Sequence, residues 1–168
     1  VVAAMTIPAL VNSHQKQVCS SALSAAVSDM ENTLSAMIMN EGMDTLTETD
    51  FYKAESVDDA SAALEKYFEV QKSGSRASDF YESTTVKGLD KSDVDLPDGY
   101  TYFSKKGALY IFTKGSDEDL KMSDVEALAE GTNLAKKAYD LVIDVNGAKK
   151  PNTVGRDIFG FAVGDDGH

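Results

Sequence analysis

The residues best suited to bind a ligand lie in one short segment near the C-terminal end of the chain. Asp144, Asn146, Asn152 and Asp157 supply carboxylate and amide oxygens there. An Asn-Gly pair within the segment permits a turn with positive φ, and a proline stiffens the return of the chain, so these oxygens can converge. Because Ca²⁺ takes several carboxylate and carbonyl oxygens in flexible geometry, the segment is a candidate calcium site.

A purely structural role is the alternative for the same segment. Its spacing is not that of an EF-hand, which needs ligands at regular odd positions and a terminal Glu. In the structural interpretation, Asp144 and Asn146 cap a tight turn, and Asp157 pairs with Arg156 or Lys150 or caps a backbone amide. The sequence leaves both interpretations open.

Side chains suited to catalysis are scarce. His14 lies in a predicted helix and His168 stands at the end of the sequence, so no Ser-His or Cys-His pair can be assigned. The glycines are dispersed and form neither GxGxxG nor GxxxxGK. Cys19 is the single cysteine, which leaves either packing as a small apolar residue or an intermolecular bridge. We therefore expect no enzymatic activity.

The charge balance excludes one class of partner. Sixteen Lys and Arg stand against 28 Asp and Glu, which gives a net charge of −12. This surplus opposes the phosphate neutralisation on which nucleic-acid affinity depends, so no nucleic-acid contact is predicted. It also predicts that the 168-residue chain is soluble. Because 42% of the residues are apolar, a chain of this length is expected to form one domain.

A long helix is predicted over residues 6–41, which contain no glycine and a single proline. Apolar residues in its second half recur at spacings of three and four, so they form one stripe that needs a partner layer. Gly42 follows the stripe and is expected to end the helix. The stripe consists of Leu23, Val27, Met30, Leu34 and Ile38.

The beginning of this helix differs from its continuation. Residues 1–11 (VVAAMTIPALV) are nearly all apolar, but they are only about half as many as a membrane-spanning helix needs. We expect Val1 to lie in the middle of an apolar segment that continued upstream. Pro8 removes a backbone hydrogen bond, so a kink or weak point is expected there. The helix thus divides into an apolar stub, residues 1–11, and a half, residues 12–41, that packs on a head formed by residues 42–168.

The head is expected to combine a second helix with a sheet. Ser56 is the predicted N-cap of that helix, which should end near Lys72. Four strands are predicted, the first two joined as a hairpin, and the fold class is α+β, with a four-stranded antiparallel sheet laid across the long helix. The strands are residues 100–104, 108–113, 139–145 and 157–163; residues 44–53, 76–95 and 115–121 are predicted loops, and residues 123–128 a short helix.

Two groups of apolar side chains have a binding role as an alternative to packing. Tyr100, Tyr102, Tyr110 and Phe112 alternate along the predicted hairpin, where they either pack it on the helix or form a platform for a ligand. The methionines on or just after the long helix either fill the core or form a pliable partner surface. These are Met30, Met37, Met39 and Met43.

Both ends of the sequence resemble one protein family. The start, VVAAMTIPALVNSHQKQ, is similar to the downstream half of the N-terminal segment of type IV pilins and type II secretion pseudopilins, in which an apolar run leads through a proline into a long helix. The later stretch DVNGAKKPNTVGRDIFGF is similar to a C-terminal signature of bacterial pilin-like proteins that carry this methylated N-terminal motif. The acidic residue that the family keeps near the start of the apolar run is absent here.

The resemblance implies a pilin-like fold and a subunit that passes from the inner membrane into a periplasmic or extracellular filament, with copies of itself and related pilins as partners. It also makes calcium relevant, because some major pseudopilins hold it in a C-terminal loop. A binding module tethered by a single helix, using the aromatic hairpin or the C-terminal loop, is the alternative. The assembly residues that the resemblance implies are Val1, Val2, Ala3, Ala4, Met5, Ile7, Pro8, Leu10 and Val11, and local unwinding is implied at Pro8.

Overall fold

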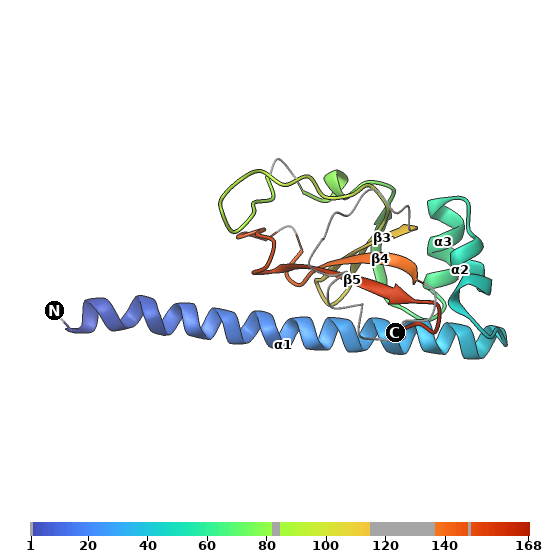
Figure 1. The fold of residues 1–168 in the computed structure, drawn as a ribbon, viewed down its shortest axis with the longest axis horizontal. Helices are drawn as coiled ribbons and strands as arrows, with labels where there is room; N and C mark the ends of the chain where they lie inside the picture. Colours follow the sequence, from blue (N-terminus) through green and yellow to red (C-terminus); the bar gives the residue numbers. More distant parts are fainter. Residues whose placement is uncertain (1, 82–84, 115–136, 148) are drawn as a thin grey trace.

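One helix forms the axis of the structure, and a head is packed on its C-terminal half (Figure 1). This computed structural model describes residues 2–81, 85–114, 137–147 and 149–168, and the side chains from residue 14 onward. Helix α1 spans Val2–Glu41 and runs through Pro8 without interruption. It ends where predicted, because Gly42 adopts φ of +66° and Met43 N–H donates to Ile38 O at 3.1 Å.

The predicted apolar stripe of α1 faces the head. Met30 and Leu34 are almost fully buried, and the other three stripe residues pack against the same core while partly exposed. Ala26 and Met37 belong to this buried face as well, and helical spacing places both beside the stripe. The polar residues of the opposite face are all exposed; they are Ser21, Ser24, Ser28, Glu31 and Asn32.

The head contains a five-stranded antiparallel sheet in which neighbours in sequence are neighbours in space, in the order β1-β2-β3-β4-β5. The four predicted strands are confirmed, with ends shifted by at most two residues. Gly107, with φ of +94°, closes the predicted hairpin between β2 and β3. The strands are β1 Val70–Gly74, β2 Tyr100–Ser104, β3 Leu109–Lys114, β4 Lys137–Asp144 and β5 Ile158–Gly164.

Short helices connect α1 to the sheet. The predicted loop at 44–53 contains two of them, η1 Leu46–Glu48 and α2 Asp50–Lys53, and α3 Val57–Leu64 follows. Ser56 caps α3 as predicted, since its Oγ accepts from Asp59 N at 3.1 Å and donates to Asp59 Oδ2 at 2.7 Å. Together α2 and α3 cover the end of the core beside the C-terminal end of α1 (Figure 1).

Two predictions are wrong: that the sheet has only four strands, and that the second helix reaches Lys72. Helix α3 ends at Leu64, and β1 begins at Val70 and pairs with β2. The segment alternates poorly, with Gln71 and Lys72 exposed in succession, so its sequence lacks the pattern of a half-buried strand. It becomes a strand because the free edge of β2 carries backbone groups that need partners.

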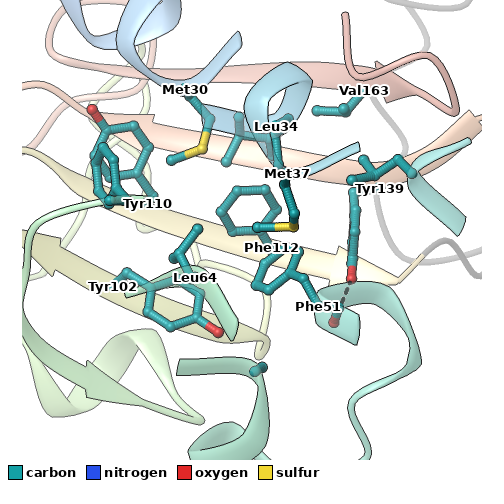
Figure 2. Packing of buried hydrophobic residues seen from close by; sticks show 14 of the residues in the cluster. Met30, Leu34, Met37, Phe51, Leu64, Tyr102, Tyr110, Phe112, Tyr139 and Val163 are labelled. Atoms are coloured by element: carbon teal, nitrogen blue, oxygen red, sulfur yellow. Dashed lines mark hydrogen bonds between the residues drawn. The ribbon is translucent and has the colours of Figure 1, made fainter. Parts of the chain in front are cut away.

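The face of the sheet that meets α1 holds the larger core. Phe51, from α2, inserts between rings of three strands, with ring centroids 5.2 Å from Phe112, 5.6 Å from Tyr139 and 6.1 Å from Tyr102. Met30, Leu34 and Met37 approach these rings from α1 (Figure 2). The rings are close enough for edge-to-face and tilted contacts, which add to the burial of apolar area.

The opposite face of the sheet is covered by the long connection between β1 and β2. This connection includes the predicted surface loop, and most of its polar residues are indeed exposed. It nevertheless contains η2 Ala77–Asp79, and it buries Ala77, Tyr81 and Val86 against the strands. The sheet is therefore buried on both faces, by a helix on one side and by a loop on the other.

Some predictions concern residues that the structure does not describe. Val1, the acidic loop at 115–121 and the short helix at 123–128 lie outside the described residues. The side chains of the apolar stub, up to residue 13, lie outside them as well. Among the helices that are described, none combines the length and the apolar character required to cross a bilayer.

Candidate functional site

The predicted ligand residues are brought together at one end of the sheet. Asp144 is the last residue of β4, and Asp157 directly precedes β5. Because β4 and β5 pair with Asp144 opposite Ile158, the two carboxylates come from neighbouring strand ends. Asp144, Asn152 and Asp157 are fully buried, and Asn146 is half-buried.

Asp157 holds the connection between β4 and β5 in place. Its Oδ1 accepts from Thr153 N at 2.6 Å, and its Oδ2 accepts from Asn152 N at 2.8 Å and from Asn146 Nδ2 at 3.2 Å. Two of these donors are backbone amides, so the structure confirms the predicted capping role. Arg156, which was a candidate ion-pair partner, instead donates to Gln15 Oε1 on α1 at 3.0 Å.

Asp144 is bound by a donor that comes from a distant part of the sequence. Its Oδ2 accepts from Tyr81 Oη at 2.7 Å, and its Oδ1 accepts from Asn146 N at 3.1 Å, which confirms the predicted turn cap. Burial raises the pKa of this carboxyl to about 7, the nearby Asp157 adds to the rise, and the bonds from Tyr81 and Asn146 oppose it. Burial also raises the pKa of Tyr81 above its usual range, so the phenol stays a donor.

The two asparagines differ in how their side chains are used. Asn152 adopts φ of +47° and, with its amide nitrogen turned inward, donates to Lys149 O at 2.7 Å and to Gly147 O at 3.3 Å. Asn146 donates through Nδ2 to Asp157, but its Oδ1 is buried and has no hydrogen-bond donor in the described part of the chain. A buried amide oxygen in this state suits a cation.

The fit to Ca²⁺ is therefore partial. Asn146 Oδ1 and remaining lone pairs of Asp144 and Asp157 are hard oxygen donors, as Ca²⁺ requires. Both carboxylates already accept two or three hydrogen bonds, and six to eight ligands would need backbone carbonyls or waters in addition. In the described ranges no group of three His, Cys, Asp or Glu side chains is arranged to hold a metal. Calcium binding stays a prediction.

No protein-family model, curated protein or solved structure matches this chain.

Two residues of this site could not be identified from sequence patterns. Tyr81 lies 63 positions before Asp144, in a stretch without periodicity. Lys87 donates its N–H to Asn152 O at 3.0 Å, and its carbonyl accepts from Val154 N at 2.9 Å. The loop that covers the sheet thus also clamps the β4–β5 connection, which only the folded chain reveals.

The predicted assembly segment forms the free end of α1. Ile7, Pro8 and Leu10 lie within the helix, well before Leu23, the first stripe residue that packs against the head. The N-terminal part of α1 extends beyond the sheet and its loops (Figure 1). The most N-terminal tie to the head that the structure describes is the bond between Gln15 and Arg156.

The aromatic hairpin is used mainly for packing. Tyr102, Tyr110 and Phe112 are buried in the core beneath α1, as the packing interpretation predicted. Tyr100 is half-buried and donates to Ala54 O at 3.0 Å, with Lys114 Nζ 5.9 Å from the centre of its ring. Three of the four rings are therefore not exposed for a ligand.

Proposed function

We propose that this chain is a structural subunit of a type IV pilus or type II secretion pseudopilus-like filament, and that it assembles through the N-terminal part of α1. The proposal rests on one observation: the two ends of this helix differ in whether they contact the head. The stripe of α1 that packs on the head begins at Leu23, and the most N-terminal tie that the structure describes joins Gln15 to Arg156. The helix before this tie projects from the head (Figure 1).

The projecting part of α1 has the composition of a segment that needs apolar partners. Its first turns read VAAMTIPALV, with no charged residue among them. A helix that is apolar all round is stable only in lipid or among other helices, and helix packing then depends on close van der Waals contact. Copies of the same segment, bundled side by side, supply such contact. The proposed route is therefore from the inner membrane into a periplasmic or extracellular filament.

The test compares acidic substitutions in the two halves of α1. We expect Ile7→Glu with Leu10→Glu to abolish self-association, because each charge would be buried between helices. The matched control is Ser21→Glu with Ser24→Glu, two exposed positions on the same helix. Association is measured by sedimentation over a range of concentrations, and thermal unfolding verifies that the head remains folded.

The control pair should associate like the unmodified chain. If the Ile7 and Leu10 substitutions leave association unchanged, the apolar segment is not the assembly element and the filament function is wrong. An unmodified chain that stays monomeric at all concentrations, in detergent and without it, would likewise contradict the filament function.

A further inference from the structure

A groove lies between the middle of α1 and the head. Its volume is about 540 Å³, and its lining includes residues of the β4–β5 connection and of the loop that follows Val86. Its floor and walls are largely apolar, and Leu89, at 75% exposure, stands at its edge. Residues that line it include Lys16, Cys19, Leu23, Leu89, Arg156 and Phe159.

The charged groups of this groove are all cationic. Lys16 and Arg156 line it and are exposed, and no acidic side chain of the described residues lines it. Lys149 and Lys150 are exposed on the same β4–β5 connection. In a chain with a net charge of −12, this is a local reversal of sign. An occupant should therefore be apolar at its tip and acidic around it.

The opposite end of the same molecule has this chemistry. Met39, in the last turn of α1, is 80% exposed, which makes it the most exposed large apolar side chain of the described residues. This turn carries no basic residue, so the negative end of the helix dipole is not compensated within it. Residues 38–69 contain two lysines but nine acids, namely Glu41, Asp44, Glu48, Asp50, Glu55, Asp58, Asp59, Glu65 and Glu69.

We propose that the groove binds the C-terminal end of α1 from a second copy of this chain, with Met39 in the apolar floor and Asp44 and Glu48 facing Lys16 and Arg156. The inference rests on the proposed filament function and names the contact between heads within it. Complementary charge is the reason for choosing this occupant, since it orients two surfaces and excludes copies docked in the wrong register.

The two surfaces of one molecule cannot meet each other. Twenty residues of helix separate Cys19 from Met39, a length of about 30 Å at 1.5 Å per residue. Each copy therefore offers its α1 end to one neighbour and its groove to another. Such a head-to-tail contact uses different surfaces on the two partners, and it propagates into an open chain unless the rotation closes a ring.

A single substitution makes this contact visible. Asn40→Cys places a second thiol beside Met39 at an exposed position and keeps the docking side chain, so a short bismaleimide should link it to the native Cys19 of the next copy and give a ladder of dimers, trimers and longer products. The native chain has one thiol and can reach only dimers. Ser28→Cys is the matched control, because Ser28 is exposed on α1 but lies outside both surfaces; it should give no ladder.

Charge reversal tests the chemistry of the contact. Adding Lys16→Glu and Arg156→Glu to the Asn40→Cys chain should reduce the ladder to the level of the Ser28→Cys control. Adding Asp44→Lys and Glu48→Lys as well should restore it, because attraction returns with its sign exchanged. Thermal unfolding of each variant shows whether the head is intact, and the restored ladder cannot arise from unfolding.

The same samples are sedimented, so that the two proposals are judged separately. If sedimentation shows large assemblies but cross-linking gives no ladder, the docking of α1 in the groove is wrong, whereas the filament function is still supported. A ladder without large assemblies supports the docking and counts against assembly through the apolar segment. If neither forms, both are wrong. A ladder that survives the charge reversal at Lys16 and Arg156 overturns the proposed recognition.

Discussion

The two faces of the sheet are buried by different means. On one face, α1 and the short helices pack against rows of large rings, and the hydroxyls of Tyr110 and Tyr139 there donate to backbone carbonyls. On the other face, the loop between β1 and β2 supplies a smaller apolar cluster and a buried polar tie from Tyr81 to Asp144. The helix face should therefore supply most of the stability, whereas the loop face fixes the β4–β5 connection.

The largest difference in the cost to stability between the two faces is expected for a pair of leucines. Leu34 is 1% exposed on the helix face, whereas Leu96 is only half-buried on the loop face. Leu34→Ala should cost about 2–5 kcal/mol because it leaves a cavity in rigid surroundings. Leu96→Ala should cost about 1 kcal/mol. Urea unfolding measures both, and equal costs would remove the distinction between the faces.

The pH dependence of stability should come from the loop face. The pKa of Asp144 is about 7 in the folded chain, above its ordinary value of 3.8. Its contribution to stability is therefore complete below about pH 4 and is lost as the pH rises through 7. The buried tyrosines of the helix face do not titrate in this range, because burial raises their pKa values further.

The measurement is unfolding between pH 4 and pH 8 in the presence of a chelator. Asp144→Asn removes the titrating group while keeping its size, so its stability should fall less over this range than that of the unmodified chain. Identical profiles for the two chains would show that Asp144 is not responsible.

Calcium is expected to act on the same end of the sheet. If the predicted site exists, millimolar Ca²⁺ should raise the melting temperature at pH 8, and saturation to 100 times the dissociation constant stabilises by about 2.7 kcal/mol. Asn146→Ala removes the buried Oδ1, which has no donor among the described residues, and this variant should lose the effect. Mg²⁺ is the control ion. No shift with Ca²⁺ in the unmodified chain contradicts the metal hypothesis.

For two tyrosine hydroxyls, unlike the leucines, the larger loss of stability is expected on the loop face. Tyr81 donates to a buried carboxylate at 2.7 Å, whereas Tyr110 donates to Ala26 O at 3.4 Å on the helix face. Tyr81→Phe leaves Asp144 Oδ2 without its donor and should cost about 1–3 kcal/mol. Tyr110→Phe should cost less, because its bond is long. Urea unfolding compares the two, and a larger loss for Tyr110→Phe would reverse the assignment of polar ties to the loop face.

The smallest effect is expected at the edge of the helix face. Lys106 Nζ lies 2.6 Å from Asp29 Oδ2 and joins the β2–β3 turn to α1, but the lysine side chain is exposed. Lys106→Ala should therefore cost about 0–1 kcal/mol in urea unfolding, and less at high salt. Lys105→Ala, at the neighbouring exposed position, is the control. A cost as large as that of Tyr81→Phe would show that this surface pair matters more than its exposure indicates.

Much of the helix face could be predicted from the sequence. Spacing of three and four identified the stripe through Met30 and Leu34, and alternation identified the hairpin that packs beneath it. Gly42 and Ser56 marked a helix end and a helix start because each has a local conformational or capping role. Such signals extend over a few residues, so they do not depend on the rest of the fold.

The loop face could not be predicted in the same way. The segment that buries Tyr81 and Val86 has neither helical nor strand periodicity, and its position depends on the sheet that it covers. For β1, the decisive factor is an unpaired edge of β2, which is a property of the assembled sheet. For Asp157, the sequence permitted both a cap and a calcium ligand; the structure confirms the cap and leaves calcium as a prediction.

The sequence by itself determined the local elements of this protein: a long helix with one apolar stripe, its ends and caps, a hairpin and an α+β arrangement. Only the tertiary structure decided the fifth strand, the second buried face, the bond from Tyr81 to Asp144, and the groove at Arg156. The physical reason is the sequence separation over which each kind of interaction acts. Periodicity and capping act between residues a few positions apart, whereas edges, covers and grooves arise between segments that meet only when the chain folds.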